Sequence, residues 1–215
     1  MSLFDPPPGT GLELLPCDGS AVLYLEVVGP KEADRMFHTL VDEITWRQNH
    51  LRMFGRVIPE PRLVSWIGDP EASYSYSGID LSPSPWTPAL TRIRRMCEQT
   101  AATTFNSVLA NLYRDGSDSV DWHSDDEPEL GHNPVIASLS LGATRRFDLR
   151  HKDTKERVSI ELPAGSVVVM SGGCQTNWAH RVAKTKKATQ PRINLTFRTI
   201  AVVDRPTNQS MQIEP

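Results

Sequence analysis

The residues most able to do chemistry are a short polar cluster, His123, Ser124 and Asp125, and a distant histidine, His180. In an extended strand, His123 and Asp125 would point to the same side, because neighbouring side chains alternate between the two faces. Both could then occupy adjacent positions on one metal ion, with His180 as a third ligand. Two imidazoles and one carboxylate leave about three positions of an octahedral ion open, a ligand set that suits ferrous iron in oxygenases. A single His-x-Asp is common by chance, so this pattern needs support from elsewhere in the chain.

A second polar pattern, the run from Arg192 to Arg198, separates into two faces under the same alternation. The polar face consists of Arg192, Asn194, Thr196 and Arg198, and the apolar face consists of Ile193, Leu195 and Phe197. The two arginines lie roughly 20 Å apart along a strand, so their long side chains would leave a gap about the length of a small dicarboxylate. Guanidinium groups bind carboxylates in bidentate fashion and stay charged when buried. The pattern therefore predicts a site for a 2-oxo diacid such as 2-oxoglutarate, with a solvated polar face as the alternative.

Four segments carry a resemblance to a known family. They are Asn111–Tyr113, Asp121–Glu127, Ala137–Ala143 and Arg192–Arg198. Together they resemble the AlkB family of Fe(II)/2-oxoglutarate dioxygenases, which demethylate alkylated nucleobases. The similarity is continuous from about Trp46 to Ile200 and is strongest to the two nucleic-acid repair branches known in animals, AlkB homologues 2 and 3.

The resemblance implies three cofactors or co-substrates, Fe(II), 2-oxoglutarate and O2. It implies that His123, Asp125 and His180 hold the metal. It further implies contacts to 2-oxoglutarate from Asn111, Tyr113, Arg192, Asn194, Thr196 and Arg198. The implied reaction is the oxidative demethylation of 1-methyladenine and 3-methylcytosine in double- and single-stranded DNA, with release of formaldehyde, succinate and CO2.

The same resemblance assigns residues to the damaged base, which an enzyme must flip out of a duplex before acting on it. The residues so assigned are Phe54, Gly55, Tyr74, Tyr76, Asp126 and Glu127. Tyr76 would stack on the base, Asp126 and Glu127 would meet its exocyclic amine, and Phe54 would fill the gap left in the duplex. The alternatives are an aromatic pair on a half-buried strand for Tyr74 and Tyr76, and a lid over the local core for Phe54.

Contacts to the nucleic-acid backbone are predicted for Arg150, Lys152, Lys186 and Lys187. The chain has a net charge of −3, so binding of a polyanion depends on local clusters rather than on total charge. Each cluster alone could also be a solvated face. In the duplex-repair branch a basic triplet grips the opposite strand, but its first position here is Thr185. We therefore expect duplex DNA to be held weakly and single strands to be accepted as well.

Three alternatives to DNA repair remain at this point. The first keeps the chemistry and takes methylated RNA as the main substrate. The second is a nucleic-acid binding module without catalysis, which the complete set of predicted ligands disfavours. The third is a hydroxylase of proteins or small metabolites, which the aromatic segments around Phe54 and Tyr76 disfavour.

The organisation of the chain indicates one catalytic domain at residues 20–203, with loosely held tails at 1–19 and 204–215. Within it we expect a nucleotide-recognition segment at 46–82 and a catalytic jelly roll at 105–200. Apolar residues at helical spacing predict a helix over Lys31–Gln48. Thr87 and Pro88 read as the cap and first turn of a second helix.

After the second helix the period changes to two. Short strands are expected at Arg146–Arg150, Val158–Leu162 and Val167–Met170. Helices followed by many strands indicate an α+β, mainly β fold: a double-stranded β-helix, or jelly roll, with the N-terminal helices packed on its outer face.

The remaining composition favours an intracellular protein. Cys17, Cys97 and Cys174 are odd in number and widely spaced, which fits a reducing compartment without disulfides. No stretch approaches the ~20 apolar residues of a membrane span, and the first residues do not resemble a signal peptide. We expect a soluble monomer without a membrane partner, cytoplasmic in a bacterium or nuclear in a eukaryote.

Overall fold

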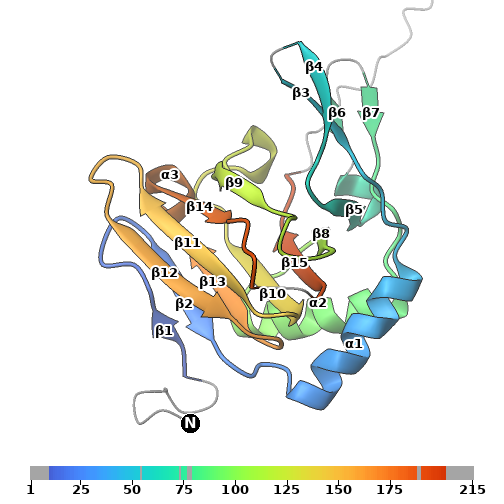
Figure 1. Ribbon diagram of the computed structural model, residues 1–215, viewed down its shortest axis with the longest axis horizontal. Helices are drawn as coiled ribbons and strands as arrows, with labels where there is room; N and C mark the ends of the chain where they lie inside the picture. The colour runs from blue at the N-terminus through green and yellow to red at the C-terminus, as the bar shows by residue number, and fades with distance from the viewer. Residues whose placement is uncertain (1–9, 54, 73, 77–78, 188–189, 202–215) are drawn as a thin grey trace, which may run out of the picture.

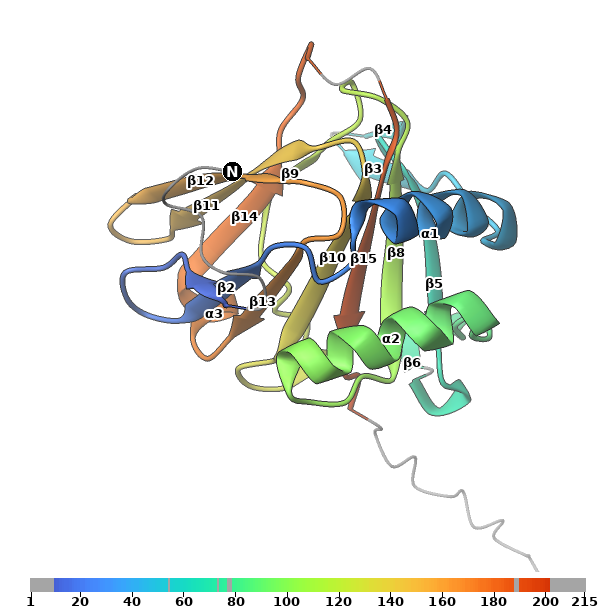
Figure 2. The ribbon, with the colours of Figure 1, turned by 90° about the horizontal axis from the view of Figure 1, so that it is seen from below.

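Two antiparallel β-sheets face each other in the computed structural model, and two long helices cover the outer side of the larger sheet (Figure 1, Figure 2). The structure describes residues 10–53, 55–72, 74–76, 79–187 and 190–201. This arrangement agrees with the predicted jelly roll and its external helices.

The larger sheet, called the major sheet here, has seven strands. In spatial order they are β1 (Leu12–Glu13), β2 (Ser20–Tyr24), β13 (Val167–Ser171), β10 (Ile136–Gly142), β15 (Arg192–Arg198), β8 (Ser107–Tyr113) and β5 (Leu63–Gly68). The minor sheet has four. They are β12 (Arg157–Leu162), β11 (Arg145–His151), β14 (Trp178–Val182) and β9 (Val120–His123). The strands predicted at the positions of β11, β12 and β13 agree with these bounds to within one residue at each end.

Two short ribbons and three helices complete the described chain. The ribbons pair β3 (His50–Met53) with β4 (Arg56–Pro59), and β6 (Tyr74–Tyr76) with β7 (Ile79–Leu81). The helices are α1 (Pro30–Glu43), α2 (Pro88–Ala101) and the single turn α3 (Cys174–Asn177), with 3₁₀ turns η1 (Pro70–Ala72) and η2 (Pro128–Leu130). Both ribbons stand at the same end of the molecule in Figure 1. Among the described residues, no helix is both long and apolar enough to cross a membrane.

The core lies on both sides of the major sheet, and β15 shows why. Its apolar residues Ile193, Leu195 and Phe197 are fully buried and belong to the cluster that includes α1 and α2. The opposite side of the sheet meets the minor sheet, where Phe147 and Leu149 belong to a second buried cluster. The polar face of β15 therefore points between the two sheets, which confirms the two faces predicted from the alternation.

The two long helices differ in how well they were predicted. α2 begins at Pro88, and the side chain of Thr87 accepts a hydrogen bond from the backbone N–H of Leu90 at 3.2 Å, which confirms the predicted cap. α1 ends at Glu43, whereas the spacing predicted a helix to residue 48. The reason is tertiary: Arg47 forms an antiparallel bridge with Val64, with N–H···O distances of 2.9 and 2.8 Å, and an extended bridge excludes a helix there.

The predicted N-terminal tail is also shorter than expected. β1 pairs with β2, so residues from 12 onward belong to the major sheet. The indole N–H of Trp178 donates to the carbonyl of Cys17 at 3.1 Å, and the amide of Asn177 donates to the carbonyl of Asp18 at 3.0 Å. Trp178 is buried, so its indole N–H needs an acceptor, and the segment supplies one. The prediction of a loose tail is therefore wrong for residues 12–19, while 1–9 and 204–215 lie outside the described residues.

Candidate metal and co-substrate site

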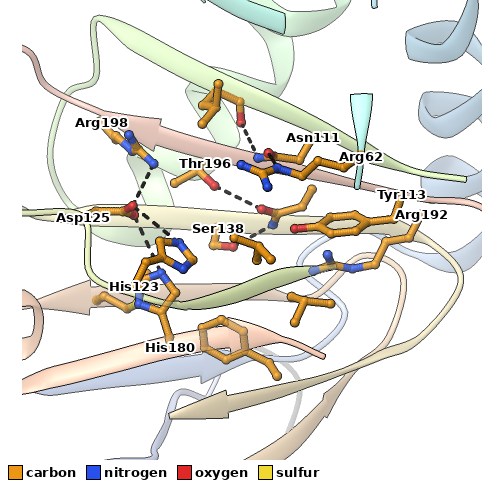
Figure 3. Close-up of a pocket in the computed structure, with 16 residues that line it drawn as sticks. Arg62, Asn111, Tyr113, His123, Asp125, Ser138, His180, Arg192, Thr196 and Arg198 are labelled. Carbon is orange, nitrogen blue, oxygen red and sulfur yellow. Dashed lines mark hydrogen bonds and ion pairs between the residues drawn. The ribbon is translucent and has the colours of Figure 1, made fainter. Parts of the chain in front are cut away.

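Three potential metal ligands converge between the two sheets. His123, at the end of β9, pairs in register with His180 of the neighbouring strand β14. Asp125 follows just beyond β9, in the chain that leaves the sheet rather than in the strand itself. One ligand atom from each residue lies within 4.8 Å of the other two. Figure 3 shows the carboxylate of Asp125 facing both imidazole rings.

Hydrogen bonds position His123 and Asp125 next to His180. Nδ1 of His123 lies 2.8 Å from the carbonyl oxygen of Asp121, which can only accept, so Nδ1 carries the proton and Nε2 is free. Nε2 of His123 lies 3.9 Å from Oδ1 of Asp125, and Nε2 of His180 lies 4.0 Å from Oδ2. The backbone N–H of Asp125 donates to Oε1 of Gln175 at 2.9 Å. Both nitrogens therefore point toward one carboxylate with room between them.

The ionisation states suit a divalent cation. Burial lowers the pKa of His180 to about 4, so its imidazole is neutral at physiological pH. Burial acts to raise the pKa of Asp125, but the charges of Arg198, His180, His123 and Arg62 together outweigh burial, and the pKa lies below its ordinary value. A neutral imidazole and an ionised carboxylate are the forms that bind metal. With two nitrogens and one carboxylate, the donor set fits Fe(II).

A second group of possible ligands, Cys17, Asp18 and His151, is less suited to a metal. Nδ1 of His151 accepts hydrogen bonds from the backbone N–H groups of Asp153 and Thr154, both at 3.1 Å. Its proton must then be on Nε2, which faces the carboxylate of Asp18 at 3.2 Å. A protonated nitrogen cannot be a ligand, so this cluster attaches the N-terminal segment rather than holding an ion.

The polar face of β15 forms the other half of the site, on the major sheet. Asn194 donates to Oγ of Ser138 at 2.8 Å and accepts from Thr196 at 3.0 Å. In the neighbouring strand β8, Asn111 lies opposite Asn194 and Tyr113 lies opposite Arg192. The structure thus brings together, on adjacent strands, all of the residues predicted to contact 2-oxoglutarate.

Arg192 is 1% exposed and incompletely paired. Its Nη2 donates to Oγ of Ser140 at 2.9 Å, and its guanidinium carbon lies 5.2 Å from the centre of the Tyr113 ring. Nε and Nη1 are buried without a hydrogen-bond partner among the described residues. Burial lowers the pKa of Arg192 to about 10, so the group is still charged at neutral pH. A buried cation with two unpaired N–H groups fits a carboxylate ligand.

Arg198, at the other end of β15, is already engaged. Its Nη2 lies 2.9 Å from Oδ1 of Asp125, and its Nη1 lies 3.9 Å from the carboxylate of Glu127. The cavity between the two arginines measures about 50 Å³, room for little more than one or two water molecules. Binding of a five-carbon diacid therefore requires some of the side chains around the cavity to move.

Two residues of this site were missed from the sequence. Arg62, which immediately precedes β5, lines the cavity and donates through Nε to Oδ1 of Asn111 at 2.8 Å. Gln175 is 1% exposed and reaches Asp125 from the single turn α3. Neither residue sits in a periodic pattern or a ligand-like motif, so no local signal could have found them.

The residues predicted to contact the base are described only in part. Phe54 lies outside the described residues, and Gly55 occupies the turn between β3 and β4 with φ +75, a conformation that favours glycine. Tyr74 and Tyr76 lie on β6, where Tyr74 pairs with Leu81. Their role in stacking stays a prediction.

Asp126 and Glu127 are exposed next to the metal ligands. The residues predicted to contact the backbone fall into two groups. The guanidinium carbon of Arg150 lies 4.2 Å from the centre of the Trp122 ring, and Lys152 donates to the carbonyl of Gln175 at 2.9 Å. Lys186 and Lys187 are exposed after β14.

The fold and site together define a class of protein: a jelly roll that holds a cluster of two histidines and one carboxylate beside a buried arginine. Residues 20–198 match the profile of the 2OG-Fe(II) oxygenase superfamily. The chain therefore belongs to that superfamily, and its relatives place it in the AlkB-type family. Membership implies Fe(II), 2-oxoglutarate and O2, which the donor set and the buried Arg192 fit.

The similarity to individual relatives extends over most of the chain. This chain is 46% identical over 188 residues to mouse alpha-ketoglutarate-dependent dioxygenase alkB homolog 3, and the match covers 83% of this chain and 65% of the mouse protein. It is 39% identical over 198 residues to mouse DNA oxidative demethylase ALKBH2, covering 86% and 82%. The chain spans 62 to 65% of the length of the four alkB homolog 3 proteins it matches.

Among solved structures, that of OsALKBH1 aligns with a TM-score of 0.60 and 16% identity. The alignment covers 87% of this chain and all of that one. At this level of identity the match concerns the fold alone, and it agrees with the jelly roll described above.

Proposed function

We propose that this protein is an Fe(II)- and 2-oxoglutarate-dependent dioxygenase that removes methyl groups from alkylated bases in DNA. The observation that carries the proposal is the convergence of His123, Asp125 and His180 beside the buried, incompletely paired Arg192. A metal ligand cluster alone would fit many reactions. Its combination with the buried, incompletely paired cation of Arg192 favours chemistry that uses a co-substrate with a carboxylate.

In the proposed mechanism His123, Asp125 and His180 would hold the iron. Bound iron supplies the activation of O2, coupled to the conversion of 2-oxoglutarate to succinate and CO2. Arg192 would donate Nε–H and Nη1–H to one carboxylate of the co-substrate, in the low-dielectric interior where such bonds are strong. The Tyr113 ring packs against the same guanidinium and keeps it in place.

The walls of the site would keep bulk water away from the reaction. Apolar side chains from both sheets line the cavity. They are Leu109, Val120, Phe147, Met170 and Val182. Exclusion of water protects reactive species from side reactions and strengthens the electrostatic contacts inside.

For the substrate, we propose 1-methyladenine and 3-methylcytosine in double- and single-stranded DNA, with the methyl group released as formaldehyde. Support comes from the relatives named DNA oxidative demethylase and from the exposed carboxylates of Asp126 and Glu127 beside the metal ligands. Carboxylates accept hydrogen bonds from an exocyclic amine, which is the donor that both bases offer. Tyr76 is proposed to stack on the flipped base, and Phe54 to fill the gap left in a duplex.

The direct test uses purified protein with ferrous iron, 2-oxoglutarate and ascorbate on oligonucleotides that carry 1-methyladenine. Matched single-stranded DNA, duplex DNA and RNA would be compared, with the products weighed by mass spectrometry. We expect loss of one methyl group from the DNA substrates in the wild-type protein and none in His180→Ala. Faster turnover of RNA than of either DNA would move the main substrate to RNA. Retention of the methyl group on every substrate by the iron-loaded wild type would overturn the proposal.

A further variant separates duplex from single-strand repair. Phe54→Ala should lower activity on duplex 1-methyladenine by about tenfold or more, since the wedge replaces stacking worth a few kcal/mol. Activity on the single strand should fall much less, because it has no partner stack to hold open. Equal losses on both substrates would assign Phe54 to the fold or the pocket.

A further inference from the structure

The outer face of the minor sheet gathers arginines, although the protein as a whole is slightly acidic. Alternation along β11 directs Phe147 and Leu149 into the core and directs Arg146 and Asp148 to the outside. On β14, His180 points into the metal site and the next residue, Arg181, points to the outer face, where it meets Asp148. One strand therefore presents a metal ligand on one side of the sheet and a cation on the other.

A buried carboxylate organises these cations. Asp148 is 2% exposed and accepts hydrogen bonds from Nε of Arg146 at 2.6 Å, from Oγ of Ser159 at 2.7 Å and from Nε of Arg181 at 2.9 Å. Burial acts against the charge on Asp148, but these bonds outweigh it, so its pKa lies below the ordinary value. Both arginines donate to Asp148 through Nε. One carboxylate thus orients two guanidinium groups, and the face keeps a net positive charge.

An indole ring adds to the order of this face. The guanidinium carbon of Arg181 lies 4.4 Å from the centre of the Trp122 ring, and that of Arg150 lies 4.2 Å from it. Cation–π contacts at these distances restrict the long side chains without neutralising them. Ordered cations lose less entropy when they bind an anion than free surface lysines do.

Beside Arg146 and Arg181 the surface forms a recess of about 500 Å³, called the outer recess here. Five cations line it, namely Arg145, Arg146, Arg181, Lys184 and Lys187, against the carboxylates of Asp148 and Glu161. Arg145 is buried and donates to the carbonyl oxygens of Asp115, Asp118 and Ala183. Its guanidinium group therefore adds a buried positive charge to the outer recess. The excess of positive charge suits an anion that carries several negative groups.

We propose that the outer recess binds phosphate groups of the substrate nucleic acid, at a place separate from the base site. The inference rests on the proposed function, because it takes the substrate to be nucleic acid. Two observations favour this polyanion. The recess is lined in part by Lys184, Thr185 and Lys187, which lie shortly after the strand that carries His180. Guanidinium groups also match phosphate oxygens in geometry.

The location of the recess predicts a dependence on substrate length. The base site lies between the sheets, while the recess lies on the outer side of the minor sheet. A strand must therefore pass around the segment after β14 to occupy both, and a very short oligonucleotide cannot do so. The contribution of the recess should grow with the length of the strand that flanks the damaged base.

The test compares two double variants with the same loss of charge. Arg146→Ala with Lys184→Ala removes two exposed cations of the recess and keeps Arg181 on Asp148. Arg35→Ala with Arg92→Ala is the matched control, because both are exposed arginines on α1 and α2, which cover the major sheet (Figure 2). Equal thermal melting of both variants and wild type would establish that folding is intact.

Binding of an unmodified single-stranded oligonucleotide to iron-loaded protein, kept free of O2, would be measured by fluorescence anisotropy over a range of salt. For two lost phosphate contacts, the slope of log Kd against log salt should fall by about 1.4. The control variant should keep the wild-type slope. Equal slopes in all three proteins would overturn the proposal, and so would equal reductions in both variants.

Two further measurements test whether the recess acts on long strands and whether it is selective for phosphate. The loss in kcat/KM of the recess variant should increase from a methylated trinucleotide to a long strand, and a loss independent of length would contradict the proposal. Polyglutamate serves as the alternative polyanion. If the recess variant weakens polyglutamate binding as much as oligonucleotide binding, the recess is not selective for phosphate. Failure of the proposed function would appear differently, as absence of demethylation by wild-type protein on every length.

Discussion

The metal half of the site lies at the minor sheet and the co-substrate half lies on the major sheet. The two halves differ in how far their residues are already positioned to bind a ligand. On the minor sheet and in the segment that follows β9, the ligand atoms of His123, Asp125 and His180 converge within 4.8 Å, and burial keeps His180 neutral. On the major sheet, Arg192 has its position but two of its buried nitrogens lack partners among the described residues. The metal half thus has its ligand atoms and charges in place. The co-substrate half has unpaired donors, and its cavity of about 50 Å³ must widen before a diacid can bind.

This difference has a physical meaning for binding. An unsatisfied buried donor costs roughly 1–3 kcal/mol, and more when it is charged. A carboxylate that pairs with Arg192 would recover this free energy, which would add to the affinity for the co-substrate. The affinity of the metal half depends mainly on geometry, because β9 and β14 place both histidines in register. The two halves should therefore respond differently to substitution.

The largest effect is expected from the metal half. His180→Ala leaves two protein ligands, and it should remove most of the bound iron and all turnover, as measured by metal analysis and by demethylation. His38→Ala is the matched control, because His38 is an exposed histidine on α1. Normal activity in His180→Ala would contradict the assignment of the three ligands.

The next effect concerns the co-substrate half alone. Arg192→Ala should raise the apparent KM for 2-oxoglutarate at least tenfold, since the loss of a charge-assisted pair costs on the order of 2 to 4 kcal/mol. Iron content should stay near the wild-type level, which would separate the two halves experimentally. Arg192→Lys keeps the charge but lacks the planar guanidinium group, so its apparent KM should lie between those of the wild type and Arg192→Ala. An unchanged KM would mean that another residue anchors the co-substrate.

A smaller effect tests what holds the metal half in shape. Gln175→Met keeps the side-chain length but removes the acceptor for the backbone N–H of Asp125. Groups that orient metal ligands typically contribute about 10- to 100-fold in affinity, and we expect the lower end here because Asp125 also pairs with Arg198. Iron titration would measure it, with the exposed Gln190→Met as control. Wild-type affinity in Gln175→Met would show that the β9 register suffices.

The smallest effect is a pH dependence on the outer side of the same sheet. The pKa of Asp148 is lowered from its ordinary value of 3.8, so its stabilising effect is complete above that value and is lost as the pH falls through the folded-state pKa. Asp148→Asn should cost about 1 kcal/mol at neutral pH, because Arg146 and Arg181 are partly solvated. The difference in Tm between the two proteins should narrow below about pH 4. A constant difference from pH 7 to pH 3 would assign the loss to packing.

Two predictions failed because local sequence patterns do not reveal contacts between residues that are far apart in the chain. The spacing of Met36 and Leu40 correctly predicts α1, but not its end, because the bridge between Arg47 and Val64 joins residues far apart in the chain. The segment before residue 20 looked loose by composition. Its attachment through Trp178 becomes visible only in three dimensions.

The sequence by itself determined which side chains share a face. Alternation along an extended chain is a property of local backbone geometry, so the split of Arg192–Arg198 into a core face and a ligand face followed from residue order alone. The residues of the metal cluster could be named in the same way, with help from the family resemblance. The apolar stripe of α2 and its cap at Thr87 belong to this class as well.

Only the tertiary structure decided how these faces meet. The register that sets His123 opposite His180, the reach of Gln175 across 50 residues to Asp125, and the position of Arg62 beside Asn111 all depend on long-range strand pairing. The outer recess is of the same kind, since its cations come from β11, β14 and the segment after it. Such contacts arise because burial and hydrogen bonding select one global arrangement of strands, which no local window of sequence can specify.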